Sequence, residues 1–222
     1  MRKHVDIQID ELLRAGVITP DDGSPFASPI IMVEKPNGEF RFCVDMRNLN
    51  KICLPLFYEL PIFEDILELM TRNKAQIITK LNMKQAYHQI PLTEDSSYKT
   101  TFITPHRGAF RYLRLPQGCS QSSYHMQVAL TKLFRNQIGT YLLVYLNDVI
   151  AVSESPSKHL EHLKVIFEKF RQTNLKLHPK KCKFFRSQVK YLRFILSAEG
   201  VQSDPKQTAI VRNYPTPKKL KI

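Results

Sequence analysis

The chain has 222 residues, of which 43% are hydrophobic, and this composition is typical of a folded globular protein and excludes a disordered chain. Its formal net charge is +13. A surface this basic favours a polyanion, with nucleic acid as the first candidate and a merely solvated basic surface as the alternative.

The cysteines and the ends of the chain indicate the cellular compartment. The four cysteines form no C-x-x-C pair, and the histidines are not spaced to complete a zinc site, which predicts reduced thiols in an intracellular protein, cytoplasmic or nuclear. The N-terminal segment lacks the apolar core of a signal peptide, and the longest apolar run, residues 141–146, is far too short to span a bilayer. We therefore expect no membrane partner. Residues 215–219 (PTPKK) resemble a linker, so we expect the chain to stop within a longer gene product.

The first part of the chain predicts a helix followed by a β-hairpin. Apolar residues between positions 5 and 13 recur at helical spacing, and Gly16 marks the end of that helix. Residues 30–35 and 40–45 predict two strands joined at the Asn-Gly pair of positions 37–38, the strongest short signal for a hairpin.

The rest of the chain alternates helices with short strands. Apolar spacing predicts helices at residues 62–70, 120–134 and 157–173. Apolar runs predict strands at residues 76–81, 110–115, 140–146, 149–153 and, in short pieces, 183–196.

Two segments place polar side chains where apolar strands end. KLNM at residues 80–83 ends one strand, and YLND at residues 145–148 forms the turn of a hairpin. Two-metal phosphoryl transfer needs carboxylates at such a tip. Taken alone, however, Asn82 reads as a strand-end residue that bonds the backbone, and Asn147 as a turn residue suited to a positive φ.

Further motifs follow one another along the chain. They are SPFASPI at 24–30, RFCVDMRNLN at 41–50, YHQI at 87–90, LPQG at 115–118, HPKKC at 178–182, SAEGV at 197–201 and YPTP at 214–217. In this order they resemble the reverse transcriptase domain of gypsy-type long-terminal-repeat retrotransposons, part of a retrovirus-like Pol polyprotein. Single motifs of this length arise by chance, whereas the ordered set is specific and covers about residues 10–219.

The resemblance implies an α+β fold, the right-handed polymerase, with fingers, a palm formed by an antiparallel sheet backed by helices, and only the start of a thumb. We place the fingers at residues 1–57 and 90–121, the palm at 58–89 and 122–205, and a thumb or linker at 206–222. The resemblance also implies that ribonuclease H and integrase domains were once joined to this one.

In this family a reverse transcriptase adds deoxynucleotides to a primer 3′ end on an RNA or DNA template, using two Mg²⁺ ions. Three aspartates hold the ions, and their positions match Asn82, Asn147 and Asp148 here. Asparagine keeps one carbonyl oxygen but loses the charge, so the ligand set falls from three negative charges to one. We therefore expect Asp148 as the remaining metal ligand, vestigial roles for Asn82 and Asn147, weakened Mg²⁺ binding, and a polymerase that is inactive or strongly impaired.

The resemblance also implies the substrate contacts. Lys35 and Arg41 match triphosphate contacts, although without the resemblance they read as exposed charges on a hairpin. Tyr87 matches the aromatic residue that packs under the incoming sugar; its alternative reading is a tyrosine of the core. Gln117 matches a residue that contacts the nucleotide; its alternative reading is a turn residue before Gly118.

The primer grip, which positions the primer 3′ end, matches Leu192, Arg193 and Phe194. The family usually has glycine where Arg193 stands, and glycine allows the close approach of a backbone. Arg193 therefore weakens the expected grip, unless it is an exposed strand residue that changes nothing. Two other functions stay open: a non-catalytic module that binds nucleic acid, and a decayed element fragment with no function.

Overall fold

A computed structural model describes residues 2–21, 23–34, 38, 40–205 and 209. The chain divides into two compact units. The first comprises the residues up to Glu59 together with Lys84–Leu130, and the second comprises Leu60–Met83 together with the chain from Thr131 onward. Each unit therefore draws on two separate stretches of sequence, and each is described by itself below.

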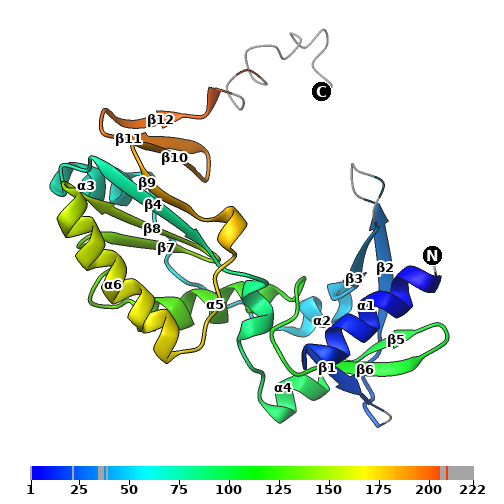
Figure 1. The fold of residues 1–222 in the computed structure, drawn as a ribbon. Helices are drawn as coiled ribbons and strands as arrows, with labels where there is room; N and C mark the ends of the chain where they lie inside the picture. The colour runs from blue at the N-terminus through cyan, green and yellow to red at the C-terminus, as the bar shows by residue number, and fades with distance from the viewer. Residues whose placement is uncertain (1, 22, 35–37, 39, 206–208, 210–222) are drawn as a thin grey trace, which may run out of the picture. The chain divides into compact units, whose positions relative to one another are not determined.

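The first unit contains a five-stranded sheet with strand order β1-β6-β5-β2-β3 (Figure 1). Its strands are β1 (Ile18–Pro20), β2 (Ser28–Glu34), β3 (Phe40–Val44), β5 (Phe102–Thr104) and β6 (Gly108–Tyr112). Its helices are α1 (Arg2–Arg14), α2 (Arg47–Ile52), the 3₁₀ helix η1 (Ala86–Gln89), α4 (Glu94–Tyr98) and the first part of α5 (Ser120–Leu133). All pairings in the sheet are antiparallel except that of β2 with β5.

The core of the first unit forms between α1 and this sheet. Val5 and Ile9 lie one turn apart on α1, and both are buried in a cluster that includes Phe102 and Tyr112. This apolar stripe explains why the segment folds as a helix against the sheet. The helix ends at Arg14, two residues before Gly16, whose φ of 62° is the left-handed conformation that glycine adopts most easily.

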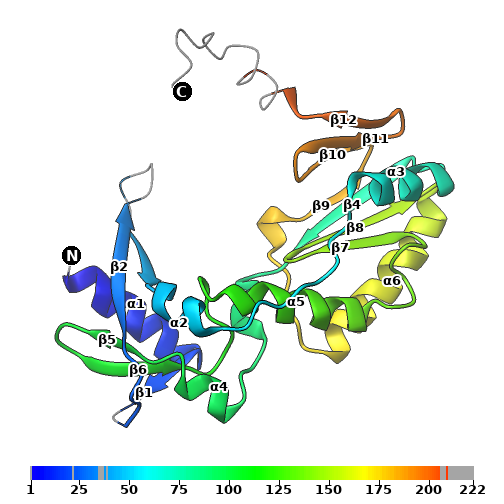
Figure 2. The ribbon, with the colours of Figure 1, turned by 180° about the vertical axis from the view of Figure 1, so that it is seen from behind.

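The second unit contains two antiparallel sheets. A four-stranded sheet has the order β7-β8-β4-β9, and a three-stranded sheet has the order β10-β11-β12 (Figure 2). The strands are β4 (Ile77–Asn82), β7 (Leu142–Tyr145), β8 (Asp148–Ser153), β9 (Lys183–Arg186), β10 (Gln188–Tyr191), β11 (Phe194–Ser197) and β12 (Gly200–Ser203). The helices are α3 (Phe63–Arg72), the end of α5, α6 (Pro156–Gln172) and the 3₁₀ helix η2 (Pro179–Lys181).

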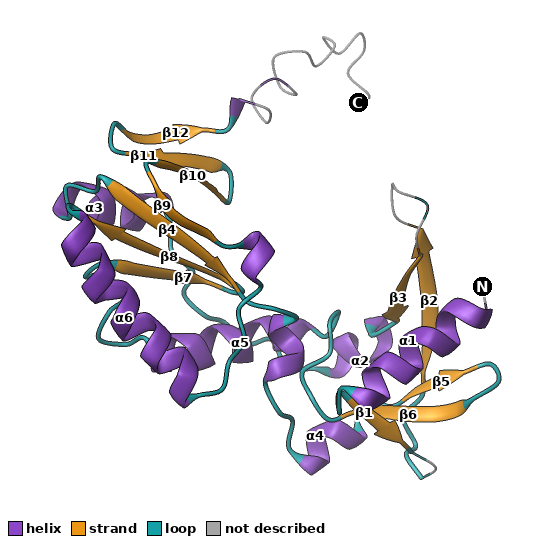
Figure 3. Ribbon diagram, viewed as in Figure 1, coloured by secondary structure: helices purple, strands orange, loops and turns teal. Residues whose placement is uncertain are grey.

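Opposite faces of the four-stranded sheet pack against different partners (Figure 3). Because side chains alternate along a strand, Ile78 and its cross-strand partner Val152 point to one face, where they join a core with α3 and the three-stranded sheet. Thr79 points to the other face, where its hydroxyl lies 2.7 Å from Nε2 of the buried His159 on α6. Ser153 Oγ completes this polar contact, 2.8 Å from Nδ1 of both His159 and His162.

The expected elements are present, with shifted ends. The helix expected at residues 157–173 is α6, which begins after Ser155, whose side chain caps the helix by accepting a hydrogen bond from the Lys158 amide. The strand expected at 110–115 is β6, which ends at Tyr112. The four cysteines are all free thiols. Within the described part of the chain, no helix combines the length and apolar character needed to cross a membrane. The expected linker at 215–219 lies outside the described residues.

Candidate functional site

The end of β4 and the β7–β8 hairpin form one structural unit. Asn82 is the cross-strand partner of Asp148, which in turn pairs with Tyr145 across the hairpin. The amide of Met83 donates a hydrogen bond of 3.0 Å to the carbonyl of Asn147. The structure therefore brings together the three positions that the sequence predicted as former metal ligands.

The turn of this hairpin differs from the simplest expectation. The left-handed residue is Leu146, with a φ of 51°, and not Asn147. A leucine in this conformation carries a steric cost that glycine or asparagine largely avoids. Asn147 itself is exposed and does not adopt the positive φ that its residue type suggested.

Both carboxylate oxygens of Asp148 already have donors. Lys80 Nζ lies 2.7 Å from Oδ2, and the Asn82 side-chain amide donates to Oδ1 at 2.6 Å. The pair is largely shielded from water, with exposed side-chain fractions of 20% for Lys80 and 17% for Asp148. The single negative charge of this site is therefore neutralised by a neighbouring lysine.

Lys80 was not predicted as a site residue, although the sequence contains a signal for it. It is the only charged residue of β4 and lies between Ile78 and Leu81, which are both fully buried. Its ammonium group also lies 5.8 Å from the centre of the Tyr191 ring. A charge at such a position requires a partner, and Asp148 supplies it.

Tyr191 adds a buried hydroxyl beside this ion pair. The side chain is fully buried, and its oxygen has no hydrogen-bond partner within the described residues. Burial raises the pKa of Tyr191 well above its usual value, and the charge of Asp148 raises it further. The hydroxyl therefore stays neutral.

The HPKKC motif fixes the backbone of Asn82. The amide of His178 donates to the Asn82 carbonyl at 2.7 Å, and the Asn82 amide lies 3.4 Å from the sulfur of the buried Cys182. The alternative reading of Asn82 as a residue that bonds the backbone through its side chain is thus not what the structure shows. Its side chain points to Asp148 instead.

The residues present do not fit a pair of Mg²⁺ ions. Mg²⁺ needs anionic oxygens in near-octahedral geometry, and this site offers one carboxylate whose oxygens already accept from Lys80 and Asn82. Among the described residues, no group of three or more His, Cys, Asp or Glu side chains could hold a metal ion.

A second candidate site lies within the first unit. Arg41 and Gln117, both predicted nucleotide contacts, line one cavity of about 650 Å³ together with Gln85 and His88. Burial lowers the pKa of His88, and its Nδ1 atom is buried without a hydrogen-bond partner among the described residues. The polar groups of this cavity that a ligand can reach include the exposed side chains of Arg41, Gln85 and Gln117.

Asn50 holds the loop that carries Gln117, a role that the sequence reasoning missed. Its side-chain amide donates to the Gly118 carbonyl, and its side-chain oxygen accepts from the Ser120 amide, both at 2.8 Å. Gly118 has a φ of 94°, which strains any residue with a side chain. The motif at 41–50 thereby positions the motif at 115–118.

Of the other two predicted nucleotide contacts, Tyr87 is not among the described residues that line this cavity. Tyr87 lies on η1, and its hydroxyl is 3.1 Å from the Ser123 hydroxyl, so it is engaged with the start of α5. Lys35 lies outside the described residues.

The predicted primer grip is the turn between β10 and β11. The left-handed residue is Leu192, with a φ of 55°, whereas Arg193 is exposed and is not left-handed. The Arg193 carbonyl accepts a hydrogen bond of 2.8 Å from the Asp204 amide, and the Phe194 ring packs 5.0 Å from that of Phe63. The backbone at position 193 therefore does not itself require glycine.

Comparison with known proteins identifies the class. The sequence pattern of the family described as "Reverse transcriptase (RNA-dependent DNA polymerase)" matches residues 33–196. This match covers most of the chain, so the chain belongs to the reverse transcriptase family. The resemblance seen in the sequence is confirmed.

The similar curated proteins are polyproteins of retrotransposons. The chain is 35% identical over 219 residues to the "Retrovirus-related Pol polyprotein from transposon gypsy" of Drosophila melanogaster, a match that covers 96% of this chain and 21% of the relative. The corresponding polyprotein from transposon opus is 34% identical, over 100% of this chain and 22% of the relative. The Tf2-3 polyprotein of Schizosaccharomyces pombe is 33% identical, over 87% of this chain and 14% of the relative. The chain thus spans about a fifth of the length of the first relatives.

Solved structures confirm the predicted fold class. The foamy viral protease–reverse transcriptase in complex with double-stranded DNA superposes with a TM-score of 0.82 at 26% identity, covering 96% of this chain and 37% of that one. The same enzyme in complex with an RNA/DNA hybrid superposes with a TM-score of 0.81 at 25% identity, and the match covers 98% of this chain and 29% of that one. The antiparallel sheets backed by helices are those of a polymerase with fingers and palm.

Proposed function

We propose that this chain is a reverse transcriptase domain that binds primer–template but transfers nucleotides at or near background. One observation carries the proposal: the only carboxylate at the β7–β8 tip, Asp148, is neutralised by Lys80 and Asn82. Two-metal catalysis requires several negative charges to hold its ions. In this reading Asn82, Asn147 and Asp148 are the former metal ligands, and Mg²⁺ binding is weakened.

The substrate contacts are assigned in the same proposal. Arg41 and Gln117 contact the incoming nucleotide from the cavity that they share. Lys35 and Tyr87 are assigned by their motif positions alone. Leu192, Arg193 and Phe194 form the primer grip.

We assign the fingers to the first compact unit and the palm to the second. The ends of the first unit lie two, six and nine residues from the fingers boundaries expected at 57, 90 and 121. Of residues 206–222, the proposed thumb or linker, the structure describes residue 209 alone.

A second candidate function is a non-catalytic module that binds nucleic acid. The net charge of +13 favours it, because a cationic domain that does not polymerise still attracts a polyanion. The foamy viral relative is seen with double-stranded DNA and with an RNA/DNA hybrid, which supports primer–template as the partner of this chain. The remaining possibility, a decayed fragment without function, predicts neither binding nor catalysis.

Primer extension by the purified chain tests the proposal. We expect extension near background for the unaltered chain, and a gain for the double variant Asn82→Asp, Asn147→Asp that far exceeds the two single gains together, because groups that act as one catalytic unit are not additive. Full recovery should also need Arg193→Gly if the grip must approach the primer closely.

Matched controls separate charge from position. The variant Asn48→Asp, Asn136→Asp adds the same two charges at exposed sites and should gain nothing. Adding Asp148→Ala to the double variant should abolish its gain. In assays repeated with Mn²⁺, the unaltered chain should lose less extension activity relative to the double variant, because we expect Mn²⁺ to tolerate poorer coordination geometry. Robust Mg²⁺-dependent extension by the unaltered chain would overturn the proposal.

A further inference from the structure

A basic cleft lies within the second unit, beside the Asp148 ion pair. Its volume is about 690 Å³, large enough for several phosphate groups. Its lining contains five cationic side chains and one carboxylate: Lys80, Lys181, Lys183, Arg186, Lys190 and Asp148. Four strands, β4, β8, β9 and β10, contribute to it.

Two of the five cations have acidic partners. Lys80 pairs with Asp148, and Lys190 pairs with the buried Asp204. Within the described residues, Lys181, Lys183 and Arg186 form no ion pair. The cleft therefore keeps an excess of positive charge after its internal pairs are counted.

The strand register concentrates this charge. Lys80 on β4 and Lys183 on β9 are direct cross-strand partners, with a register shift between Lys80 and Ile78. Like charges placed opposite each other destabilise a sheet, and one carboxylate, Asp148, can neutralise only one of them. A bound anion would relieve the remaining repulsion.

A simpler explanation covers only part of this arrangement. Charged residues on edge strands discourage pairing between sheets, and β9 is an edge strand whose four residues are all exposed. That explanation accounts for Lys183 and Arg186. It does not account for Lys80, which lies on the interior strand β4 with 20% of its side chain exposed.

We propose that this cleft binds phosphate groups directly, without a divalent metal ion. The ligand is either the phosphodiester backbone of a nucleic acid strand or a free polyphosphate, which present the same chemistry to lysine and arginine. The inference deepens the proposed function and rests on it for the nucleic acid ligand. Where the family's centre holds cations between carboxylates, this chain has a cationic site that takes the anion itself.

Calorimetry in the presence of EDTA tests the inference with two probes, inorganic tripolyphosphate and a short single-stranded oligonucleotide. The cleft variant is Lys183→Ala, Arg186→Ala, both at exposed positions that leave the core untouched. Since each lost contact to a charged group is worth more than 1 kcal/mol, the variant should weaken binding by about tenfold or more. For the oligonucleotide, the slope of log affinity against log salt should fall by about 2.

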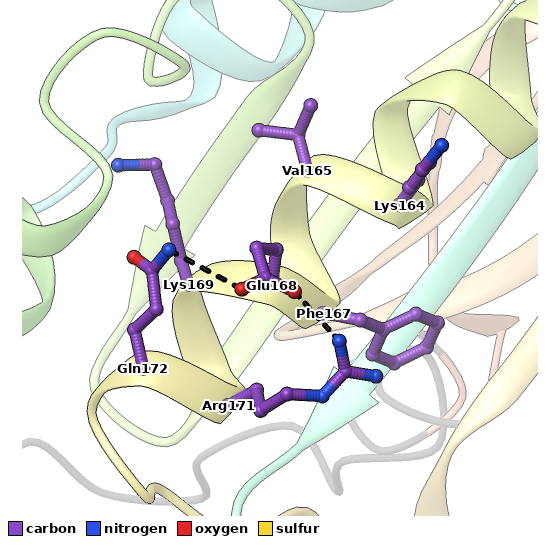
Figure 4. A pocket seen from close by; sticks show the side chains of 7 residues that line it. All are labelled: Lys164, Val165, Phe167, Glu168, Lys169, Arg171 and Gln172. Carbon is purple, nitrogen blue, oxygen red and sulfur yellow. Dashed lines mark hydrogen bonds and ion pairs between the residues drawn. The ribbon is translucent and has the colours of Figure 1, made fainter.

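The matched control removes two lysines from the same unit, outside the cleft. It is Lys164→Ala, Lys176→Ala, and Figure 4 shows Lys164 on α6 beside the shallow hollow formed by that helix. This control should change the affinity for either probe less than about twofold, because single exposed charges contribute little. Thermal unfolding of neither variant should begin at a lower temperature than that of the unaltered chain, and the cleft variant can be more stable because it loses the repulsion between Lys80 and Lys183.

Each outcome decides the inference. If the two probes compete with each other and the cleft variant binds neither, the cleft binds phosphate groups of either source. If only the oligonucleotide binds, and the cleft variant loses that binding, the ligand is a nucleic acid strand. Equal binding by the cleft and control variants overturns the inference, even if the unaltered chain binds primer–template and the proposed function stands. If the unaltered chain binds no nucleic acid, the proposed function fails and the tripolyphosphate titration alone decides the inference.

Discussion

At the scale of single residues, the partners of Asp148 determine the chemistry at the hairpin tip. With three carboxylates at the tip, Lys80 could neutralise only one of them, and the others would remain free to bind metal. With one carboxylate, the lysine and the Asn82 amide each occupy one of its two oxygens. Under the proposal that Asn82 and Asn147 stand where aspartates once stood, their replacement changes what Asp148 does, and not only the total charge.

A double-mutant cycle measures this ion pair. We expect Lys80→Met and Asp148→Asn to show a coupling free energy of about 1–3 kcal/mol, between the values for exposed and fully buried pairs. Chemical denaturation gives the free energies of unfolding. The exposed pair Lys158–Glu154, 3.0 Å apart, is the control and should show little coupling. Equal coupling in the two pairs would contradict the shielding described for Lys80 and Asp148.

The buried histidine on α6 predicts a pH dependence of stability. Burial, together with a smaller effect of the nearby His162, lowers the pKa of His159 to about 4, whereas an unfolded histidine titrates near 6.5. The unfolded chain therefore binds the proton first, so stability is complete above about pH 6.5 and falls as the pH drops toward 4, by at most about 3 kcal/mol.

Urea denaturation across this pH range checks the effect. His159→Gln should flatten the decline, since the titrating group is gone, while His4→Gln at an exposed position should leave it unchanged. A decline of the same steepness in both variants would show that other groups control the acid sensitivity.

At the scale of elements, two hairpin turns place leucine in a left-handed conformation. Leu146 lies between β7 and β8, and Leu192 between β10 and β11. In both turns the polar neighbour, Asn147 or Arg193, is exposed and keeps a negative φ. The strain is thus carried by two partly buried leucines, of which Leu192 packs on the core of the second unit.

The β10–β11 turn yields a prediction about glycine. Because Arg193 is not left-handed, Arg193→Gly relieves no strain and adds freedom to the unfolded chain, so it should lower the free energy of unfolding by about 0.5–1 kcal/mol. Arg193→Ala should be close to neutral. Thermal or urea unfolding measures both. Stabilisation by glycine would mean that position 193 is strained after all.

Periodic elements were predictable from the sequence, and long-range partners were not. The apolar stripe and Ser155 cap of α6 are local features, so its position followed directly from the sequence. The three-residue strand β1 has no pattern of its own and exists because it pairs with β6. Lys80 escaped prediction for a similar reason: its partner Asp148 adjoins it only through the pairing of β4 with β8.

At the scale of the whole molecule, the net charge of +13 is the property most relevant to binding. We expect the chain to bind primer–template and single strands with weak sequence preference, and log affinity to fall linearly with log salt as counterions are released. Fluorescence anisotropy over a salt titration measures this. A peptide nucleic acid of the same sequence, which lacks phosphates, is the control and should bind poorly. Affinity that is absent, or indifferent to salt, would contradict the prediction.

The pairing of β4 has a consequence during synthesis on the ribosome. Its partners come late, since Asp148 follows Asn82 by 66 residues and Cys182, just before β9, by 100. At about 5–20 residues per second, the last partner emerges about 5–20 s after β4. Throughout that interval Ile78 and Leu81, which are fully buried in the finished fold, lie in a nascent strand with open edges. The lysine between them is then the one charge that discourages this segment from pairing with another chain before its own partners are made.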